Sequence, residues 1–320
     1  MRRREVIVLL GAALIVHPAW AQRPVKLKRI GFLRVGEPPS TWIASFREGL
    51  REFGLIEGQH FTIEFGLAQS TAEVPGIAAE LVRRNVDVLV ASGTPSVLAA
   101  REAAGTIPVV FVTVIDLIGT GQVASLARPG GNATGITSMI ADLAAKRLQL
   151  LKELLPQASK FTILVRTGSP ATPAFVREAE RAAQVLGVGL QVLRMNNPSE
   201  LESLFASAQG AGGLTMADDA VFTAHRKRIA ELALQQRLPT LFGFREMVEA
   251  GGLISYGPRY RDLYRQAAGQ VHKILNGTKP GDIPVEQPTR FEVVLNMRTA
   301  RELKLTIPAT ILVRVDEILE

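Results

Sequence analysis

Short apolar runs alternate with amphipathic segments along most of this chain, and this alternation constrains its fold more than any other feature. Runs such as 87–91 and 108–115 are almost continuously apolar, as is typical of parallel strands that are buried on both faces. The first series predicts strands at 28–35, 61–65, 87–91 and 108–115, with helices at 41–53, 72–84 and 96–104. A strand–helix–strand repetition of this kind predicts a doubly wound parallel sheet.

A second series of the same kind follows residue 137. It predicts strands at 161–166, 191–195, 213–216 and 240–242, with helices at 143–154, 173–186, 198–209 and 220–237. The last part is less regular, with predicted strands at 252–256 and 291–295 around a helix at 260–276. A chain of 320 residues exceeds what one hydrophobic core usually serves. We therefore predict an α/β protein with two doubly wound parallel-sheet lobes.

The first 21 residues have the layout of an export signal. Three arginines at positions 2–4 precede an apolar run over 6–16, and Ala19-Trp20-Ala21 has the small–x–small pattern that signal peptidase cleaves. The apolar run is shorter than the roughly 20 residues that a membrane-spanning helix needs. We expect a signal peptide over 1–21, cleavage after Ala21 and a periplasmic mature protein. The alternative is an uncleaved N-terminal anchor.

Charge and cysteine content exclude several classes of site. The chain has no cysteine, which excludes disulfides, thiolate metal sites and a lipid-modified cysteine anchor. The formal net charge is +7, but the basic residues are scattered over predicted helix faces and are not interleaved with aromatic residues. Nucleic-acid binding needs a clustered basic patch with stacking platforms. We expect a monomer with no nucleic-acid partner, no metal and no other cofactor.

A set of short motifs runs through the chain in a characteristic order. The segments are Gly31-Phe32-Leu33, Phe46–Gly54 with Glu57-Gly58, Ser92–Ser96, Pro108–Phe111 with Asp116, Leu126–Gly135, Ile274–Gly277, Ile283–Glu286, Leu295-Asn296 and Leu305–Pro308. Together they resemble the ABC-transporter substrate-binding family that includes tryptophan- and tyrosine-binding proteins, over nearly the whole chain after residue 22. One departure is Asp116-Leu117-Ile118, where the family often has Asp-Pro-Val.

This resemblance implies a type I periplasmic-binding fold, in which two lobes are joined by three crossovers and the ligand lies in the cleft. Lobe one is expected at 22–137 and 256–286, and lobe two at 138–255 and 287–320. The implied function is capture of a small carboxylate-bearing ligand, an amino acid or a related and possibly aromatic molecule, for the membrane permease of an ABC importer.

Ligands of open α/β sheets bind outside the carboxyl ends of the strands, and this rule selects a few loops independently of the resemblance. The first loop is Ser92–Ser96. Thr94 suits the N-cap of the next helix and Pro95 suits its first position. The amides of Ser96 and Val97 then face the cleft, and the hydroxyls of Ser92, Thr94 and Ser96 add hydrogen bonds. We predict that this helix start binds a carboxylate.

Carboxylates occupy other strand ends. Asp116 ends the fourth strand and either pairs with a ligand ammonium or caps the turn before Gly119. Of Asp218 and Asp219, one is expected to cap the helix from Ala220 and the other to bind the ligand. An anion site in one lobe and a carboxylate in the other predict a zwitterionic ligand. Further candidates at strand ends or at the first crossover are Thr137, Ser169, Phe244 and Tyr256.

Other functions have weaker support in the sequence. There is no Gly-x-Ser-x-Gly elbow and no Walker A loop. Gly119-x-Gly121-x-x-Ala124 matches a dinucleotide fingerprint, but it follows the fourth predicted strand and not the first. The main alternative is a secreted α/β hydrolase or transferase with an unrecognised site. A sugar-responsive transcription regulator of the same fold would need a helix-turn-helix where the signal peptide lies. We expect a binding protein and not an enzyme.

Overall fold

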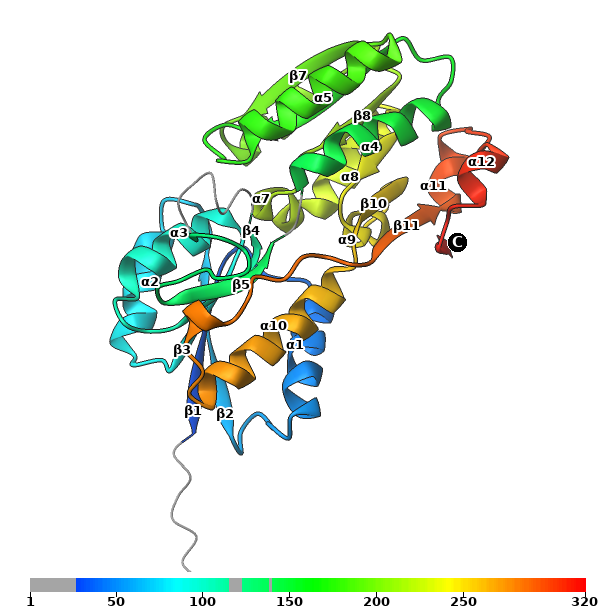
Figure 1. Ribbon diagram of the computed structural model, residues 1–320. Coiled ribbons are helices and arrows are strands. Elements are labelled where there is room, and N and C mark those ends of the chain that lie inside the picture. Colours follow the sequence, from blue (N-terminus) through cyan, green and yellow to red (C-terminus); the bar gives the residue numbers. More distant parts are fainter. Residues whose placement is uncertain (1–26, 115–122, 138–139) are drawn as a thin grey trace, which may run out of the picture.

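The strands form two separate sheets, each inside its own lobe (Figure 1). The computed structural model describes residues 27–114, 123–137 and 140–320. The first sheet has the order β2-β1-β3-β4-β5, and every neighbouring pair in it is parallel. Its strands are β1 (Lys28–Val35), β2 (Phe61–Ala68), β3 (Val88–Ser92), β4 (Val109–Val114) and β5 (Ala133–Thr137). The predicted doubly wound construction of this lobe is confirmed.

Among the described residues, four helices cover the two faces of the first sheet. These are α1 (Ser40–Glu52) with α10 (Tyr260–Leu275) on one face, and α2 (Val74–Arg83) with α3 (Thr94–Ala103) on the other. Helix α1 buries Trp42, Phe46 and Leu50, whose spacing of four residues forms one apolar stripe. A Cβ at Gly49 would lie 2.9 Å from the carbonyl oxygen of Arg265, so only glycine permits the close packing of α1 on α10.

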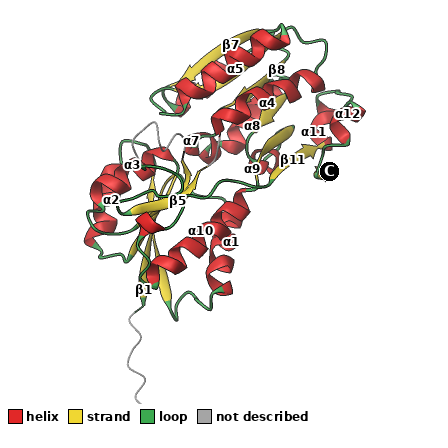
Figure 2. Ribbon diagram, viewed as in Figure 1, coloured by secondary structure: helices red, strands yellow, loops and turns green. Residues whose placement is uncertain are grey.

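The second sheet has the order β12-β11-β10-β9-β8-β6-β7 (Figure 2). Its strands are β6 (Lys160–Arg166), β7 (Gly189–Met195), β8 (Gly213–Met216), β9 (Thr240–Phe242), β10 (Ile254–Pro258), β11 (Phe291–Asn296) and β12 (Glu317–Leu319). Strands β10 and β11 are antiparallel, and the other neighbouring pairs are parallel.

The helices of the second lobe complete its layers. They are α4 (Ile140–Leu154), α5 (Thr172–Leu186), α6 (Leu201–Ser207), α7 (Ala220–Ala224), α8 (Arg226–Gln235), α9 (Arg245–Glu249), α11 (Met297–Glu302) and α12 (Ala309–Leu312). Two 3-10 turns, Pro198–Glu200 and Pro280–Asp282, precede α6 and follow α10. Helices α4 and α5 pack together on one face of the sheet, and α6, α8 and α9 lie on the other.

The chain passes between the lobes three times, after β5, after β10 and before β11 (Figure 1). The prediction that residues 256–258 belong to lobe one is wrong. Tyr256, Gly257 and Pro258 pair with Val293, Glu292 and Phe291 of β11, so the second sheet keeps them and the crossover follows Pro258.

Nowhere in the described ranges does a helix have the length and apolar character needed to cross a bilayer. The predicted cleavage after Ala21 lies outside the described residues.

Candidate ligand-binding site

The carboxyl ends of the two sheets face each other and enclose a narrow cavity of about 30 Å³. Lobe one contributes Arg34, Trp42, Ser92, Gly93, Thr94, Pro95, Thr113 and Tyr260, and lobe two contributes Ser169, Asp218, Asp219, Ala220, Thr223 and Phe244. Most of these residues end a strand or follow one within three positions. The rule that ligand sites lie at strand carboxyl ends therefore selects residues that line this cavity.

The predicted loop after β3 lines this cavity, but its local geometry differs from the prediction. Helix α3 begins at Thr94, and Gly93 is its N-cap at φ +83°. The prediction that Thr94 is the cap is therefore wrong, because the turn needs a positive φ that glycine adopts without strain. Thr94 and Pro95 instead form the first turn of the helix at the cavity wall.

The two serines of this loop have different surroundings. The Ser92 hydroxyl lies 2.7 Å from the Tyr264 hydroxyl, which fixes the end of β3 to α10. Ser96 is fully buried, and its hydroxyl has no hydrogen-bond partner among the described residues. Ser96 is also absent from the cavity wall.

Arg34, near the end of β1, is a cavity residue that sequence reasoning missed. Its side chain is buried, and its Nη1 donates to the carbonyl oxygens of Val35, Gly36 and Glu37 at 3.2, 3.4 and 3.1 Å. Its guanidinium carbon lies 5.3 Å from the centre of the Trp42 ring, a cation–π contact. Burial lowers the pKa of Arg34 from its usual value. A lone arginine between Leu33 and Val35 in an apolar strand was the signal available in the sequence.

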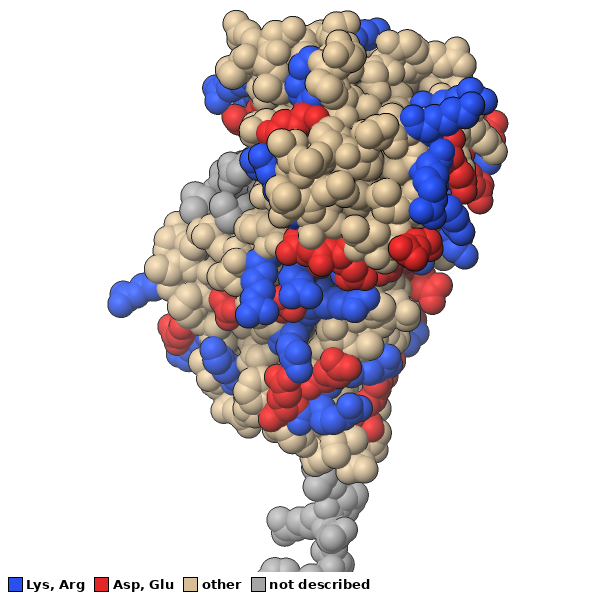
Figure 3. Space-filling model, turned by 90° about the vertical axis from the view of Figure 1, so that its right-hand side faces the viewer, with Lys and Arg blue, Asp and Glu red and all other residues tan. Residues whose placement is uncertain are grey.

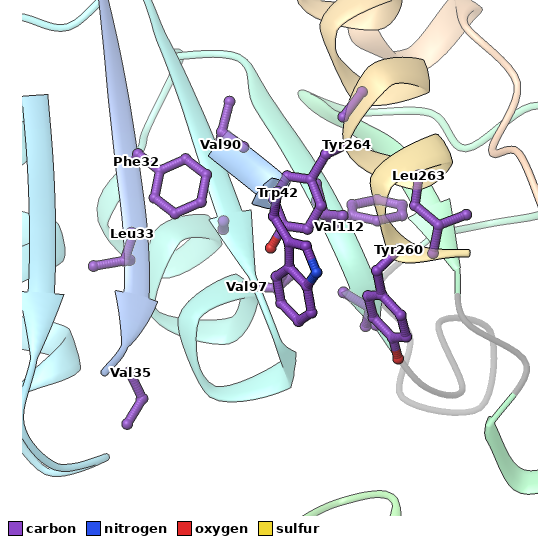
Figure 4. Close-up of a cluster of buried hydrophobic side chains, with 14 of the residues drawn as sticks. Phe32, Leu33, Val35, Trp42, Val90, Val97, Val112, Tyr260, Leu263 and Tyr264 are labelled. Carbon is purple, nitrogen blue, oxygen red and sulfur yellow. The ribbon is translucent and has the colours of Figure 1, made fainter. Parts of the chain in front are cut away.

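An aromatic cluster forms the next wall of the cavity (Figure 4). The Trp42 ring stacks on Tyr260 and Tyr264 at centroid distances of 4.9 and 5.2 Å. The ring centroid of Phe244 in lobe two lies 4.7 Å from that of Tyr260 in lobe one. The predicted cavity position of Phe244 is thus where the structure puts it, whereas Trp42 and Tyr260 were not predicted. All three rings line the cavity and offer an apolar surface from both lobes.

One hydrogen bond in this region joins the two lobes directly. The indole Nε1 of Trp42 in α1 donates to Oε1 of Glu246 in α9, at 2.5 Å. Glu246 is 3% exposed, and its Oε2 has no partner among the described residues. Burial raises the pKa of Glu246 to about 7, although the hydrogen bond from Trp42 opposes that shift. A buried carboxyl with a raised pKa therefore lies where the two lobes meet.

Both predicted lobe-two aspartates line the cavity, but each has an arginine partner. Asp218 forms a bidentate ion pair with Arg147, with oxygen–nitrogen distances of 2.7 and 2.8 Å. Asp219 caps α7 by accepting from the amide of Val221 at 2.8 Å, and its other oxygen accepts from Nε of Arg166 at 2.8 Å. The prediction that one aspartate caps the helix is right for Asp219. The other aspartate, Asp218, lines the cavity and is paired with Arg147, and its binding of the ligand stays a prediction.

Of the remaining predicted residues that the structure describes, one lines the cavity and two do not. Ser169 lines the cavity. Thr137 does not, since its hydroxyl donates to the carbonyl oxygen of Val114 at the first crossover. Tyr256 stacks on Phe291, away from the cavity, because β10 continues past it in the second sheet. Asp116 lies outside the described residues.

Thr113 is a further cavity residue with an unusual backbone. It lies at the irregularity between Val112 and Val114 in β4 and has a φ of +61°. Non-glycine residues seldom adopt this conformation, and bulges of this kind turn side chains toward sites at sheet edges. The bulge therefore shapes the end of β4 where it meets the cavity.

Charged side chains of both signs gather across the middle of one face, where the lobes meet (Figure 3). Arg259 and Arg261, at the start of α10, pair with Glu292 of β11 and Glu249 of α9 at 3.4 and 3.6 Å. These pairs join the second crossover to lobe two on the outside of the molecule. Arg261 and Glu249 are both partly exposed, so their pair contributes little to stability, whereas Glu292 is buried.

Comparison with known proteins agrees with this architecture. A tyrosine-binding protein of Clostridioides difficile is 27% identical over 284 residues, which cover 88% of this chain and 82% of that protein. A conserved domain protein from Vibrio cholerae has a TM-score of 0.85 at 26% identity, and an ABC domain from Streptococcus pneumonia in complex with L-Trp has one of 0.84 at 24% identity. Each alignment covers 92% of this chain and 100% of the other.

The family model described as ABC transporter substrate binding protein matches residues 40–319. The match confirms the resemblance carried by the sequence motifs and assigns the chain to binding proteins and not to enzymes. The chain belongs to the ABC transporter substrate-binding protein family.

Proposed function

We propose that this protein is the periplasmic component of an ABC importer and that it captures a small carboxylate-bearing ligand, an aromatic amino acid or a close relative of one. The observation that carries the proposal is a buried cavity whose wall comes from the strand ends of both lobes. A ligand that contacts both lobes at once binds the closed state better than the open one, and so shifts the protein toward closure.

The chemistry of the cavity supports a ligand with a carboxylate and an aromatic ring. Arg34 and the first turn of α3 supply positive potential on the lobe-one side. Trp42, Tyr260 and Phe244 supply ring-stacking surfaces. The C. difficile relative is a tyrosine-binding protein, and the S. pneumonia structure contains L-Trp. Recognition of the closed form by the membrane permease then delivers the ligand inward.

Ligand addition is expected to raise the thermal stability of the purified mature protein. At a ligand concentration of about 100 times Kd, binding to the native state alone stabilises it by about 2.7 kcal/mol. For a protein of this size that corresponds to an increase in Tm of about 5–10 °C. The measurement is a melting-temperature screen of aromatic and aliphatic carboxylates, with candidates drawn from mass spectrometry of molecules released on denaturation. Turnover in hydrolase or transferase assays, with no stabilisation by any carboxylate, contradicts the proposal.

Export is tested separately from ligand binding. The protein recovered from the periplasm of a Gram-negative host is expected to begin at Gln22, because cleavage follows Ala21. N-terminal sequencing of that fraction provides the measurement. Recovery of the chain from the cytoplasm with its first residues intact contradicts the periplasmic assignment and leaves ligand capture to be judged on its own data.

A further inference from the structure

We infer that the segment Phe244–Glu249, which comprises α9 and the residue before it, is a latch that holds the lobes closed through contacts of its own, with Arg245 as the residue that positions it. The latch belongs to lobe two and lies where the lobes meet (Figure 1). It concerns what the two lobes contact and not what they bind, so it goes beyond the proposed function. Two sets of contacts reach lobe one, and a third anchors the segment in lobe two.

Phe244 and Glu246 make the buried contacts with lobe one. The Phe244 ring meets those of Trp42 in α1 and Tyr260 in α10 at centroid distances of 6.0 and 4.7 Å. Glu246 accepts from the indole nitrogen of Trp42. All four side chains are buried. Opening of the lobes must therefore separate packed rings and break a buried hydrogen bond, and both losses favour the closed form.

Glu249, the last residue of α9, makes the second contact with lobe one. Its Oε1 lies 3.6 Å from a guanidinium nitrogen of Arg261, in the first turn of α10. This pair is partly exposed and contributes little by itself. The same oxygen accepts from Nε of Arg245 at 2.9 Å. Glu249 therefore links Arg245 to the helix that covers the first sheet.

Arg245 anchors the segment in lobe two. Its Nη2 donates to both oxygens of Glu317 in β12 at 2.9 Å, and its Nη1 donates to Glu292 in β11 at 3.2 Å. The side chains of Arg245 and Glu292 are 9% and 7% exposed, so this pair is shielded from water. Glu292 also faces Arg259, the residue before α10, at 3.4 Å. Arg245 thus fixes α9 to β11 and β12 and, through Glu292, to the second crossover.

A latch of this kind lets the lobes close before a ligand arrives. The closed form, favoured by the buried contacts of Phe244 and Glu246, is then one of two populated states of the protein. Arg245 is a positioning residue, because its removal frees α9 from β11 and β12 and so weakens contacts that its neighbours make. If the protein captures a ligand as proposed above, the affinity for that ligand rises with the closed population.

Distances across the cleft of the ligand-free protein test the latch. The chain has no cysteine, so Ser70→Cys and Gln235→Cys introduce the two sites for spin labels. Both positions are exposed; Ser70 follows β2 and Gln235 ends α8, and residues Leu67 of β2 and Arg226 of α8 line one groove between the lobes. Double electron–electron resonance is measured on mature protein refolded from guanidinium, which removes retained small molecules. A population at the distance of the closed structure is expected, and its absence overturns the inference.

A variant series assigns that population to the latch. Arg245→Ala is expected to lower the ratio of closed to open protein by about fivefold, the size of effect that residues of a coupling network have. Trp42→Phe keeps a ring but removes the donor to Glu246, and is expected to lower the ratio by about tenfold. Arg314→Gln is the matched control, because it breaks an ion pair with Glu153 inside lobe two and is expected to leave the distances unchanged.

A purely structural role of Arg245 gives a different result. In that case Arg245→Ala lowers the melting temperature and leaves the distance distribution as in the native protein, which overturns its role in the latch. The native distribution and the Trp42→Phe comparison stand even where Arg245→Ala does not fold. No ligand enters these measurements, so failure of the latch leaves the proposed ligand capture to be judged by the melting-temperature screen.

Discussion

Asp218→Asn is expected to lower the free energy of unfolding by about 3–5 kcal/mol, because it leaves the guanidinium of Arg147 buried without a counter-charge. Arg147 is fully buried, and besides Asp218 its partners among the described residues are the backbone carbonyls of Tyr256 and Met216. These carbonyls cannot neutralise its charge. The measurement is urea denaturation of the ligand-free protein followed by circular dichroism.

Two further variants make this prediction specific to the buried pair. Glu178→Gln removes an exposed ion pair with Arg181 on α5 and is expected to cost less than about 0.5 kcal/mol. The double variant Arg147→Met with Asp218→Leu is expected to recover much of the loss, since an apolar pair of similar volume needs no neutralisation. A loss for Asp218→Asn that is no larger than that for Glu178→Gln contradicts the prediction.

Ligand affinity is expected to fall as pH rises from about 5.5 to 8, by up to about 30-fold. In the closed protein, burial raises the pKa of Glu246 to about 7. We expect opening of the lobes to expose this carboxyl to water and so to return its pKa toward the usual value of about 4.5, because burial is the main cause of the shift. Loss of the hydrogen bond from Trp42, which lowers the pKa, opposes only part of this return. The closed state then binds more protons than the open state over this interval, so closure is favoured at low pH and weakens as pH rises through 7. Above that pH the affinity levels off.

The measurement is titration calorimetry between pH 5.5 and 8 with an aromatic carboxylate that stays ionised throughout. Glu246→Gln is expected to flatten the profile, because the amide oxygen still accepts from Trp42 and does not titrate. Glu249→Gln, on the same short helix but partly exposed, is the matched control and should retain the pH dependence. A flat profile for the native protein, or an unchanged one for Glu246→Gln, contradicts the role of this carboxyl.

Buried strands were the most predictable part of the fold, because each is an apolar run bounded by turn residues. Strand β1 and strand β9 begin and end where the sequence predicts. Strand β5 was missed, since Thr134 and Gly135 interrupt its apolar character and its identity depends on pairing with β4. The helix predicted over 220–237 is divided at His225 into α7 and α8. The sequence has no glycine or proline at this position, so the break could not be predicted.

The sequence predicted which residues lie at strand ends near the candidate site, but not the partners that these residues contact. Ser92, Thr94 and Asp218 were found because parallel strands bring their carboxyl ends to one edge. Their partners are distant in sequence: Arg147 is 71 residues from Asp218, and Trp42 is 204 residues from Glu246. Only the folded chain brings these groups together. The sequence therefore could not show that each aspartate is paired with an arginine.

The position of α10 in the chain affects the order in which the lobes can fold. This helix covers the first sheet beside α1, yet it lies more than 120 residues after β5, beyond most of the second lobe. Without it, the face of the sheet that α10 covers has no partner, and α1 lacks the helix against which Gly49 packs. Lobe one therefore cannot close its core until nearly the whole chain has been synthesised. Contacts of such long sequence separation fold slowly. The chain of lobe one is therefore expected to stay unfolded until synthesis is nearly complete, which suits the export proposed above.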